Sequence, residues 1–113
     1  MRDSRARLSD ILDAIAAIRR HAGRGREAFE RDELVQVWIV HHLQIIGEAA
    51  GRLDQELVKS SEAPWTGIVG MRNILVHRYF GIDLDAVWRV VERDLDPLEA
   101  EARRLLDEGS PPS

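Results

Sequence analysis

The chain has 113 residues, a formal net charge of -4 and a pI of about 5.5, and this balance excludes a uniformly basic surface for nucleic acids. Cysteine is absent, which excludes disulfides, thiolate metal sites and a thiol nucleophile. The length predicts one domain over residues 1–108 and a frayed tail over residues 109–113. Because the sequence shows neither a membrane span nor a secretory signal pattern, we expect a cytoplasmic protein.

The first predicted helix begins just after Asp3 or Ser4 and stops before Gly23, where Gly23 and Gly25 punctuate a loop. Its apolar residues recur at three- and four-residue spacing, as on one face of a helix: Leu8, Ile11, Leu12, Ile15 and Ile18. A second helix is predicted over residues 29–51. Its apolar residues occupy more than one face, so we expect it to be central or to bury a second face in a subunit interface.

The second half of the chain is also predicted to be helical. Polar residues 54–61 form a connection, and Pro64 suits the first turn of a third helix that carries His77 and is broken by Gly81. Asp83 can cap a last helix with a long apolar stripe, in which Pro97 predicts a kink or a break. Helices with short links and no competing strand signal predict an all-α fold, an antiparallel bundle of four to five helices.

The basic residues are almost all arginine, fifteen against the single Lys59, so contact with a polyanion would depend on local arginine clusters. One such cluster lies around the end of the first predicted helix and comprises Arg19, Arg20, Arg24 and Arg26. Two interpretations are open for it, a solvated helix end and a contact with RNA. The sequence does not choose between them.

A short stretch, residues 71–80, combines a guanidinium, an amide, an imidazole and the only tyrosine of the chain: Arg72, Asn73, His77 and Tyr79. Arginine binds phosphate through a planar, always charged fork, and histidine exchanges protons near neutral pH. At about 100° per residue, Arg72 and His77 are separated by roughly 140° on a helix. A two-fold axis beside this helix would bring both copies of each side chain into one cleft, so we expect a homodimer.

This stretch and its surroundings resemble the HepT-type minimal HEPN toxins of prokaryotic toxin–antitoxin pairs. The similar segments are Pro64-Trp65, residues 70–88, the sequence Ile45-Ile46-Gly47-Glu48-Ala49-Ala50, and an N-terminal segment over residues 8–15. Together they extend over nearly the whole chain. An Arg-x4-His spacing alone recurs by chance, but within these flanking residues it is specific.

The resemblance implies an all-helical homodimer of the HEPN type that acts as a metal-independent endoribonuclease on RNA, with tRNA among the candidate substrates and no cofactor. Carried onto this sequence, it assigns Arg72, Asn73 and His77 to the catalytic site. It also implies a partner, an MNT-type nucleotidyltransferase antitoxin, which silences the toxin by transferring AMP from ATP to Tyr79.

A different class of function is also open, a catalytically inactive helical module whose motif docks a nucleotidyltransferase. Taken alone, Arg72 and His77 could instead serve as an ion-pair partner and a helix cap. Glu48 is expected to pair with an arginine inside the bundle, and His41 and His42 are expected to be structural because no carboxylate–histidine spacing suggests a metal site. Core or interface roles are the simplest interpretation of the three tryptophans, Trp38, Trp65 and Trp88, and stacking of one of them on an RNA base is the alternative.

Overall fold

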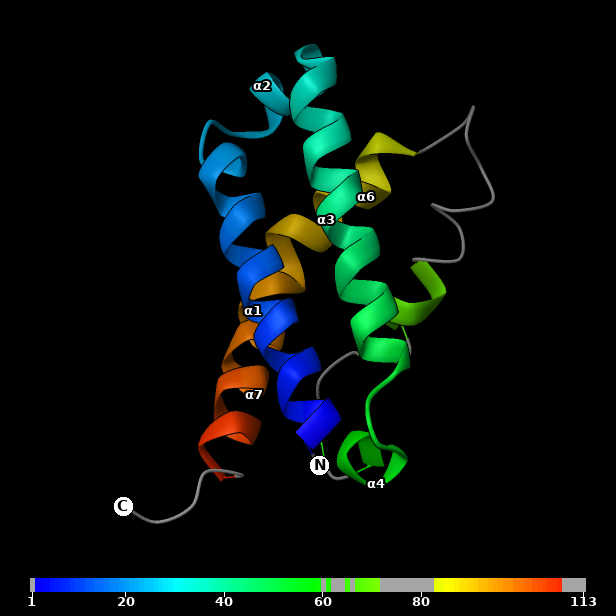
Figure 1. The fold of residues 1–113 in the computed structure, drawn as a ribbon. Helices are drawn as coiled ribbons and strands as arrows, with labels where there is room; N and C mark the ends of the chain where they lie inside the picture. Colours follow the sequence, from blue (N-terminus) through cyan, green and yellow to red (C-terminus); the bar gives the residue numbers. More distant parts are fainter. Residues whose placement is uncertain (1, 60, 62–64, 66, 72–82, 109–113) are drawn as a thin grey trace.

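The computed structural model describes residues 2–59, 61, 65, 67–71 and 83–108 (Figure 1). Every regular element within these residues is a helix, which confirms the predicted all-α class. In chain order the helices are α1 (Arg2–Ala22), α2 (Arg26–Arg31), α3 (Glu33–Gly51), α4 (Gln55–Lys59), α6 (Leu84–Arg93) and α7 (Leu95–Glu108). Residues 67–71 are helical as well.

Helix α1 packs against both α3 and α7 (Figure 1). Near the start of α1, the Arg5 guanidinium donates a hydrogen bond of 2.8 Å to the carbonyl oxygen of Leu106, late in α7. Near the end of α1, the Arg19 guanidinium donates one of 2.7 Å to Glu99, early in α7. These two contacts show that α1 and α7 run antiparallel, as the predicted bundle requires.

The core lies where these helices meet, and the predicted apolar stripe of α1 supplies much of it. Burying a large apolar side chain contributes roughly 1.5–3 kcal/mol, so this stripe is a principal source of stability. The largest side chains that are fully buried are Leu8, Ile11, Ile15, Ile18, Phe29, Ile39, Leu43, Ile46, Ile68, Leu95 and Leu98.

The second helix differs from its prediction, because the span 29–51 is broken at Asp32 into α2 and α3. Asp32 has extended backbone angles (φ -113°, ψ 105°), and its carboxylate accepts hydrogen bonds from the backbone N–H groups two and three residues later, at 3.0 and 3.4 Å. At the end of α2, the Gln36 side-chain amide donates hydrogen bonds to the carbonyl oxygens of Phe29 and Glu30, at 3.0 and 3.1 Å. Side chains therefore satisfy backbone groups at both helix ends that meet at this corner.

Residues 54–61 were predicted to form a polar connection, and they contain the short helix α4 instead. The Asp54 carboxylate explains its start, since it accepts a hydrogen bond of 3.0 Å from the backbone N–H of Glu56. The third predicted helix is described at Trp65 and over residues 67–71. Pro64, predicted in its first turn, and its predicted continuation through His77 to the break at Gly81 lie outside the described residues.

The last predicted stripe is divided into α6 and α7, with the break at Asp94, three residues before Pro97. Proline lacks the N–H that a helix interior needs and its ring clashes with the carbonyl four residues earlier, whereas it is tolerated in a first helical turn. Pro97 lies in the first turn of α7, so the predicted break is confirmed slightly upstream of the proline. Asp83 caps α6 as predicted, by accepting from the N–H groups of Asp85 and Ala86 at 3.0 and 3.2 Å.

Candidate functional site

The residues predicted to carry the chemistry lie within residues 72–82, outside the described part of the chain: Arg72, Asn73, His77 and Tyr79. The structure describes the chain on either side of them. Ile68 is buried in the core and Met71 is half-buried against it. On the other side, Asp83 caps α6 and Leu84 packs against the core as its first residue. The described residues that border the motif segment, Met71 and Asp83, therefore both belong to the helical bundle.

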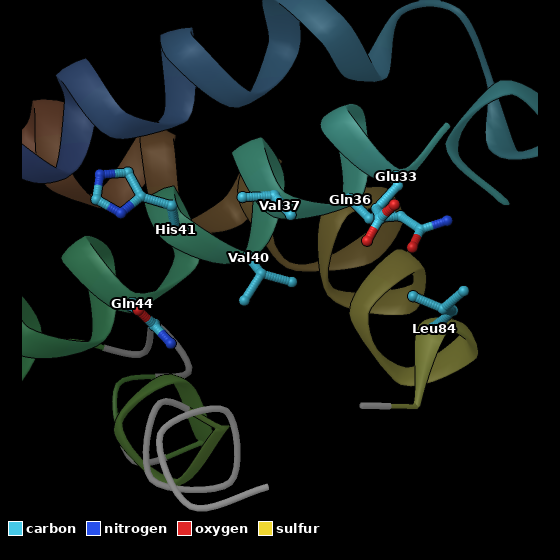
Figure 2. Close-up of a pocket in the computed structure, with 7 residues that line it drawn as sticks. All are labelled: Glu33, Gln36, Val37, Val40, His41, Gln44 and Leu84. Carbon is cyan, nitrogen blue, oxygen red and sulfur yellow. The ribbon is translucent and has the colours of Figure 1, made fainter. Parts of the chain in front are cut away.

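A hollow of about 510 Å³ lies between α3 and the start of α6 (Figure 2). This volume lies in the range of small-molecule sites, about 300–1,000 Å³. Val40 and Leu84 give it apolar walls, and the ring of His41 and the amide of Gln44 supply hydrogen-bonding groups. Since Leu84 stands two residues after the motif segment, this hollow is the described surface nearest to that end of the segment in sequence. Its lining consists of Glu33, Gln36, Val37, Val40, His41, Gln44 and Leu84.

The outer face of α3, which we define as Leu34, Val37, His41, Gln44 and Glu48, borders this hollow. The spacing of these residues alternates between three and four, so they share one side of the helix. Leu34 is 81% exposed and Val37 60% exposed. Apolar residues thus occupy more than one side of this helix, as predicted, and on the outer face they are the exposed pair Leu34 and Val37 at its N-terminal end.

Glu48 lies on that outer face and is exposed. The expectation that it would lie inside the bundle is therefore wrong, because the helical turn carries it away from the buried row that contains Leu43 and Ile46. His41 is exposed as well, whereas His42 is half-buried with its Nδ1 2.8 Å from the carbonyl oxygen of Trp38. No group of three or more potential metal-ligating side chains occurs within the described residues.

The three tryptophans have different surroundings. Trp65 and Trp88 are buried in the core, which confirms their predicted role. The indole N–H of Trp65 donates to the Ser61 hydroxyl at 2.8 Å, and the Trp88 ring lies 5.3 Å from that of Phe29. Trp38 is only half-buried, and its indole N–H donates to the carbonyl oxygen of Ala17 at 2.7 Å. It therefore links α3 to α1 at the edge of the core.

Two of the four clustered arginines form ion pairs within the bundle. Arg19 pairs with Asp96 and Glu99 at the start of α7. Its hydrogen bond to Glu99 is the main reason why the pKa of that carboxyl is lowered. Arg26 pairs with Glu30 and, across to α6, with Asp85. These long-range partners are what the sequence could not reveal, and they leave Arg20 and Arg24 as the candidates for an external ligand.

The described residues define a small helical bundle, and comparison with known proteins identifies its family. Residues 11–105 match the family model described as Ribonuclease HepT-like. Because the match takes in most of the chain, the chain belongs to the HepT-like ribonuclease family. The resemblance seen in the sequence is confirmed. Within the described residues, no helix combines the length and apolar character needed to cross a membrane.

Individual relatives agree with this family. The chain is 32% identical over 100 residues to a Thermococcus cleftensis protein named "Probable ribonuclease HepT", with 87% of this chain and 91% of the relative covered. It is 34% identical over 108 residues to a Caldanaerobacter subterraneus subsp. tengcongensis protein named "Putative RNase", with 94% and 96% covered. A Methanocaldococcus jannaschii relative, named as a gamma-glutamylcyclotransferase and putative RNase, is 31% identical over 109 residues, which span 95% of this chain and only 49% of that protein. No solved structure matches the chain significantly.

Proposed function

We propose that this chain is the toxin of a toxin–antitoxin pair and cleaves RNA in the cytoplasm as a metal-independent endoribonuclease, with tRNA among its substrates. One observation carries this proposal. The region that matches the HepT-like ribonuclease family, residues 11–105, contains Arg72, Asn73, His77 and Tyr79 at the spacing of the motif. The relatives named as ribonucleases support the same reaction class.

The proposed chemistry uses the nucleophile that RNA itself carries. A His77 imidazole removes the proton of the 2′-hydroxyl, whose oxygen attacks the adjacent phosphorus, and the bond from phosphorus to the 5′-oxygen breaks. The leaving 5′-oxygen takes a proton from an imidazolium, the His77 of the second copy. Arg72 stabilises the charge that develops on the phosphorane, and Asn73 orients His77 or binds a phosphate oxygen. The products are a 2′,3′-cyclic phosphate and a 5′-hydroxyl.

This division of labour requires two copies of the chain, and the outer face of α3 is the surface that we assign to the homodimer. Exposed large apolar side chains at Leu34 and Val37 favour burial against a partner, since interface cores are apolar and depleted of charge. In an isologous contact, this face of one copy would pack against the same face of the other copy across the two-fold axis. The hollow beside Leu84 borders this face, so the contact would lie close in sequence to the end of the motif segment.

Purified chain incubated with total RNA and a chelator tests the nuclease directly. We expect cleavage to products that end in a 2′,3′-cyclic phosphate, while a DNA copy of the substrate stays intact because it lacks the 2′-hydroxyl. His77→Ala should reduce cleavage by at least ~10²–10⁴-fold with an unchanged circular dichroism spectrum. Intact RNA with the wild-type chain, together with binding to a nucleotidyltransferase, would instead identify an inactive docking module.

The proposed antitoxin is a nucleotidyltransferase that transfers AMP from ATP to the Tyr79 hydroxyl and releases pyrophosphate. The added phosphate would occupy the Arg72 fork and repel the RNA backbone. Intact-mass measurement after incubation with such an enzyme and ATP should show an AMP adduct on the wild-type chain and none on Tyr79→Phe. The same adduct on both chains would refute the assignment.

A further inference from the structure

Trp38 is the centre of a cationic and aromatic cluster at the edge of the bundle, which we define as Arg20, His21, Arg24, Trp38 and His42. The His21 ring lies 5.0 Å from the Trp38 ring, nearly edge-on, and the His42 ring lies 4.4 Å from it. The Arg20 guanidinium carbon is 5.7 Å from the Trp38 ring centroid, within the range of a cation–π contact. Because its neighbours crowd the indole, Trp38 supports the cluster rather than offering a free ring for stacking.

Arg20 and Arg24 remain available to a ligand. Both are exposed, and among the described residues neither has a carboxylate within ion-pair distance. Arg19 and Arg26, which come from the same segment, are held by acids of α6, α7 and α2. The fold thus separates the four arginines into two that join helices and two that face solvent.

Two surface hollows are lined by residues of this cluster. A hollow of about 470 Å³ includes His21, Arg24 and His41, and a second of about 340 Å³ includes Arg20 and His42.

The carboxylates of these hollows are partly engaged elsewhere. Asp32, in the first hollow, uses its carboxylate to cap α3. In the second hollow, Asp10 lies 3.9 Å from Arg7, and Asp13 is the remaining acid. Of the three carboxylates in these hollows, one caps α3 and one pairs with Arg7, which leaves Asp13 beside the two guanidiniums and the imidazoles.

We infer that this cluster is a binding site for the sugar–phosphate backbone of single-stranded RNA, a substrate subsite outside the Arg72 and His77 motif. Guanidinium forks bind phosphate oxygens in pairs, and the imidazoles add further hydrogen-bond donors. A local cluster of this kind can bind a polyanion although the whole chain carries a net charge of -4. This inference rests on the proposed ribonuclease function.

The cluster also borders the surface that we assign to the homodimer. Val37 and His41 line both the hollow next to Arg24 and the hollow next to Leu84. These two residues are therefore the boundary between the cationic cluster and the start of α6. An RNA strand held by Arg20 and Arg24 would pass the edge of the proposed subunit interface, where the His77 side chains of the two copies are proposed to act.

The test measures RNA binding in the His77→Ala background, so that cleavage does not interfere. Affinity for a short, end-labelled single-stranded RNA is measured between about 50 and 200 mM salt, with and without Arg20→Ala and Arg24→Ala together. The matched control is Arg52→Ala with Lys59→Ala, which also removes two positive charges from exposed positions, at the C-cap of α3 and the end of α4. The oligomeric state of each variant is measured by light scattering.

The slope of log affinity against log salt is negative, and loss of two phosphate contacts should make it shallower by about 1.4. Affinity at 0.1 M salt should fall by on the order of tenfold. The control pair should retain most of the wild-type slope. Equal losses in both pairs, or no loss, would overturn the inference, and conversion of the arginine variant to monomers would assign the cluster to a protein contact. If the wild-type chain binds RNA in this way but leaves it intact, the subsite stands and the nuclease proposal fails.

Discussion

On the inner face of α3, Val35, Ile39 and Leu43 are at most 5% exposed, whereas on its outer face Leu34 and Val37 are 81% and 60% exposed. Residues of one chemical type thus have two roles within one helix. The inner row stabilises the monomer through burial. Leu34 and Val37 on the outer face contribute little to the monomer, so their apolar character favours a contact outside it. Mutations that act on one face and spare the other test this distinction.

The largest effect is expected from Ile39→Ala on the inner face. Ile39 is fully buried, so the truncation should cost about 2–5 kcal/mol of unfolding free energy, from lost transfer energy and the cavity that remains. Val37→Ala on the outer face removes a similar group and should stay within ~0.5 kcal/mol. Urea denaturation of the two variants checks this, at a concentration where both are monomeric. Similar losses at the two positions would show that the outer face is also part of the folded core.

On the outer face, Leu34→Glu combined with Val37→Glu is expected to affect dimerisation and cleavage and to spare the stability of the monomer. Charges at these positions should separate the proposed dimer and reduce RNA cleavage by about 10²-fold or more, while the helical signal and denaturation midpoint of the monomer are retained. Gln55→Glu with Ala100→Glu is the control, because it adds charges at two other exposed positions. Light scattering and a cleavage assay report the result. A pair of glutamates that leaves both mass and cleavage unaltered would place the dimer on another surface.

A smaller effect is expected from Asp32→Ala, at the corner between α2 and α3 where both faces of α3 begin. The variant loses the side-chain oxygen that caps α3 and should lose about 1 kcal/mol of stability. Asp32→Asn retains an oxygen in that position and should lose less. Thermal denaturation distinguishes them, and equal losses in both would argue against the cap as the cause.

The smallest effect concerns the seam between α1 and α7. The pKa of Glu99 is lowered chiefly by its hydrogen bond to Arg19, so the folded chain binds fewer protons there than the unfolded chain. The Glu99 carboxylate therefore contributes fully to folding stability above the ordinary glutamate pKa of ~4.3. This contribution is lost as the pH falls through the lower pKa of the folded chain. With partial exposure of both side chains, 37% and 27%, solvent screening limits it to about 1 kcal/mol.

Glu99→Gln tests this seam. The variant should be less stable than the wild type at neutral pH, and the difference should shrink when the pH falls below the ordinary glutamate pKa. Denaturation at both pH values measures it. A difference that grows toward acid would have the wrong sign for a carboxyl whose pKa is lowered by folding.

Much of the fold could be predicted because its signals are local. The stripe of α1 and the Asp83 cap of α6 are encoded within a few residues each. The break at Asp32 was missed because the apolar pattern continues across it, although an aspartate followed by Glu33 is itself a helix-start signal. The exposure of Glu48 was missed because sequence spacing did not show which side of α3 faces the bundle.

The candidate site divides in the same way. Arg72, His77 and Tyr79 could be proposed from a contiguous motif and its resemblance to a family. Which arginines of the 19–26 cluster are available could not be predicted, because it depends on distant acids such as Asp85 and Asp96 that only the folded chain brings near. Pairing across 59 and 77 positions of sequence leaves no local pattern.

The corner at Asp32 has a further consequence. Its exposed helix ends are closed by the chain's own carboxylate and amide groups, so the first turns of α3 are held without help from a ligand. A partner or nucleic acid that approaches Leu34 or Val37 therefore meets a preorganised surface, and little conformational entropy remains to be lost on association. Recognition at this end of the molecule should consequently resemble rigid docking rather than coupled folding and binding.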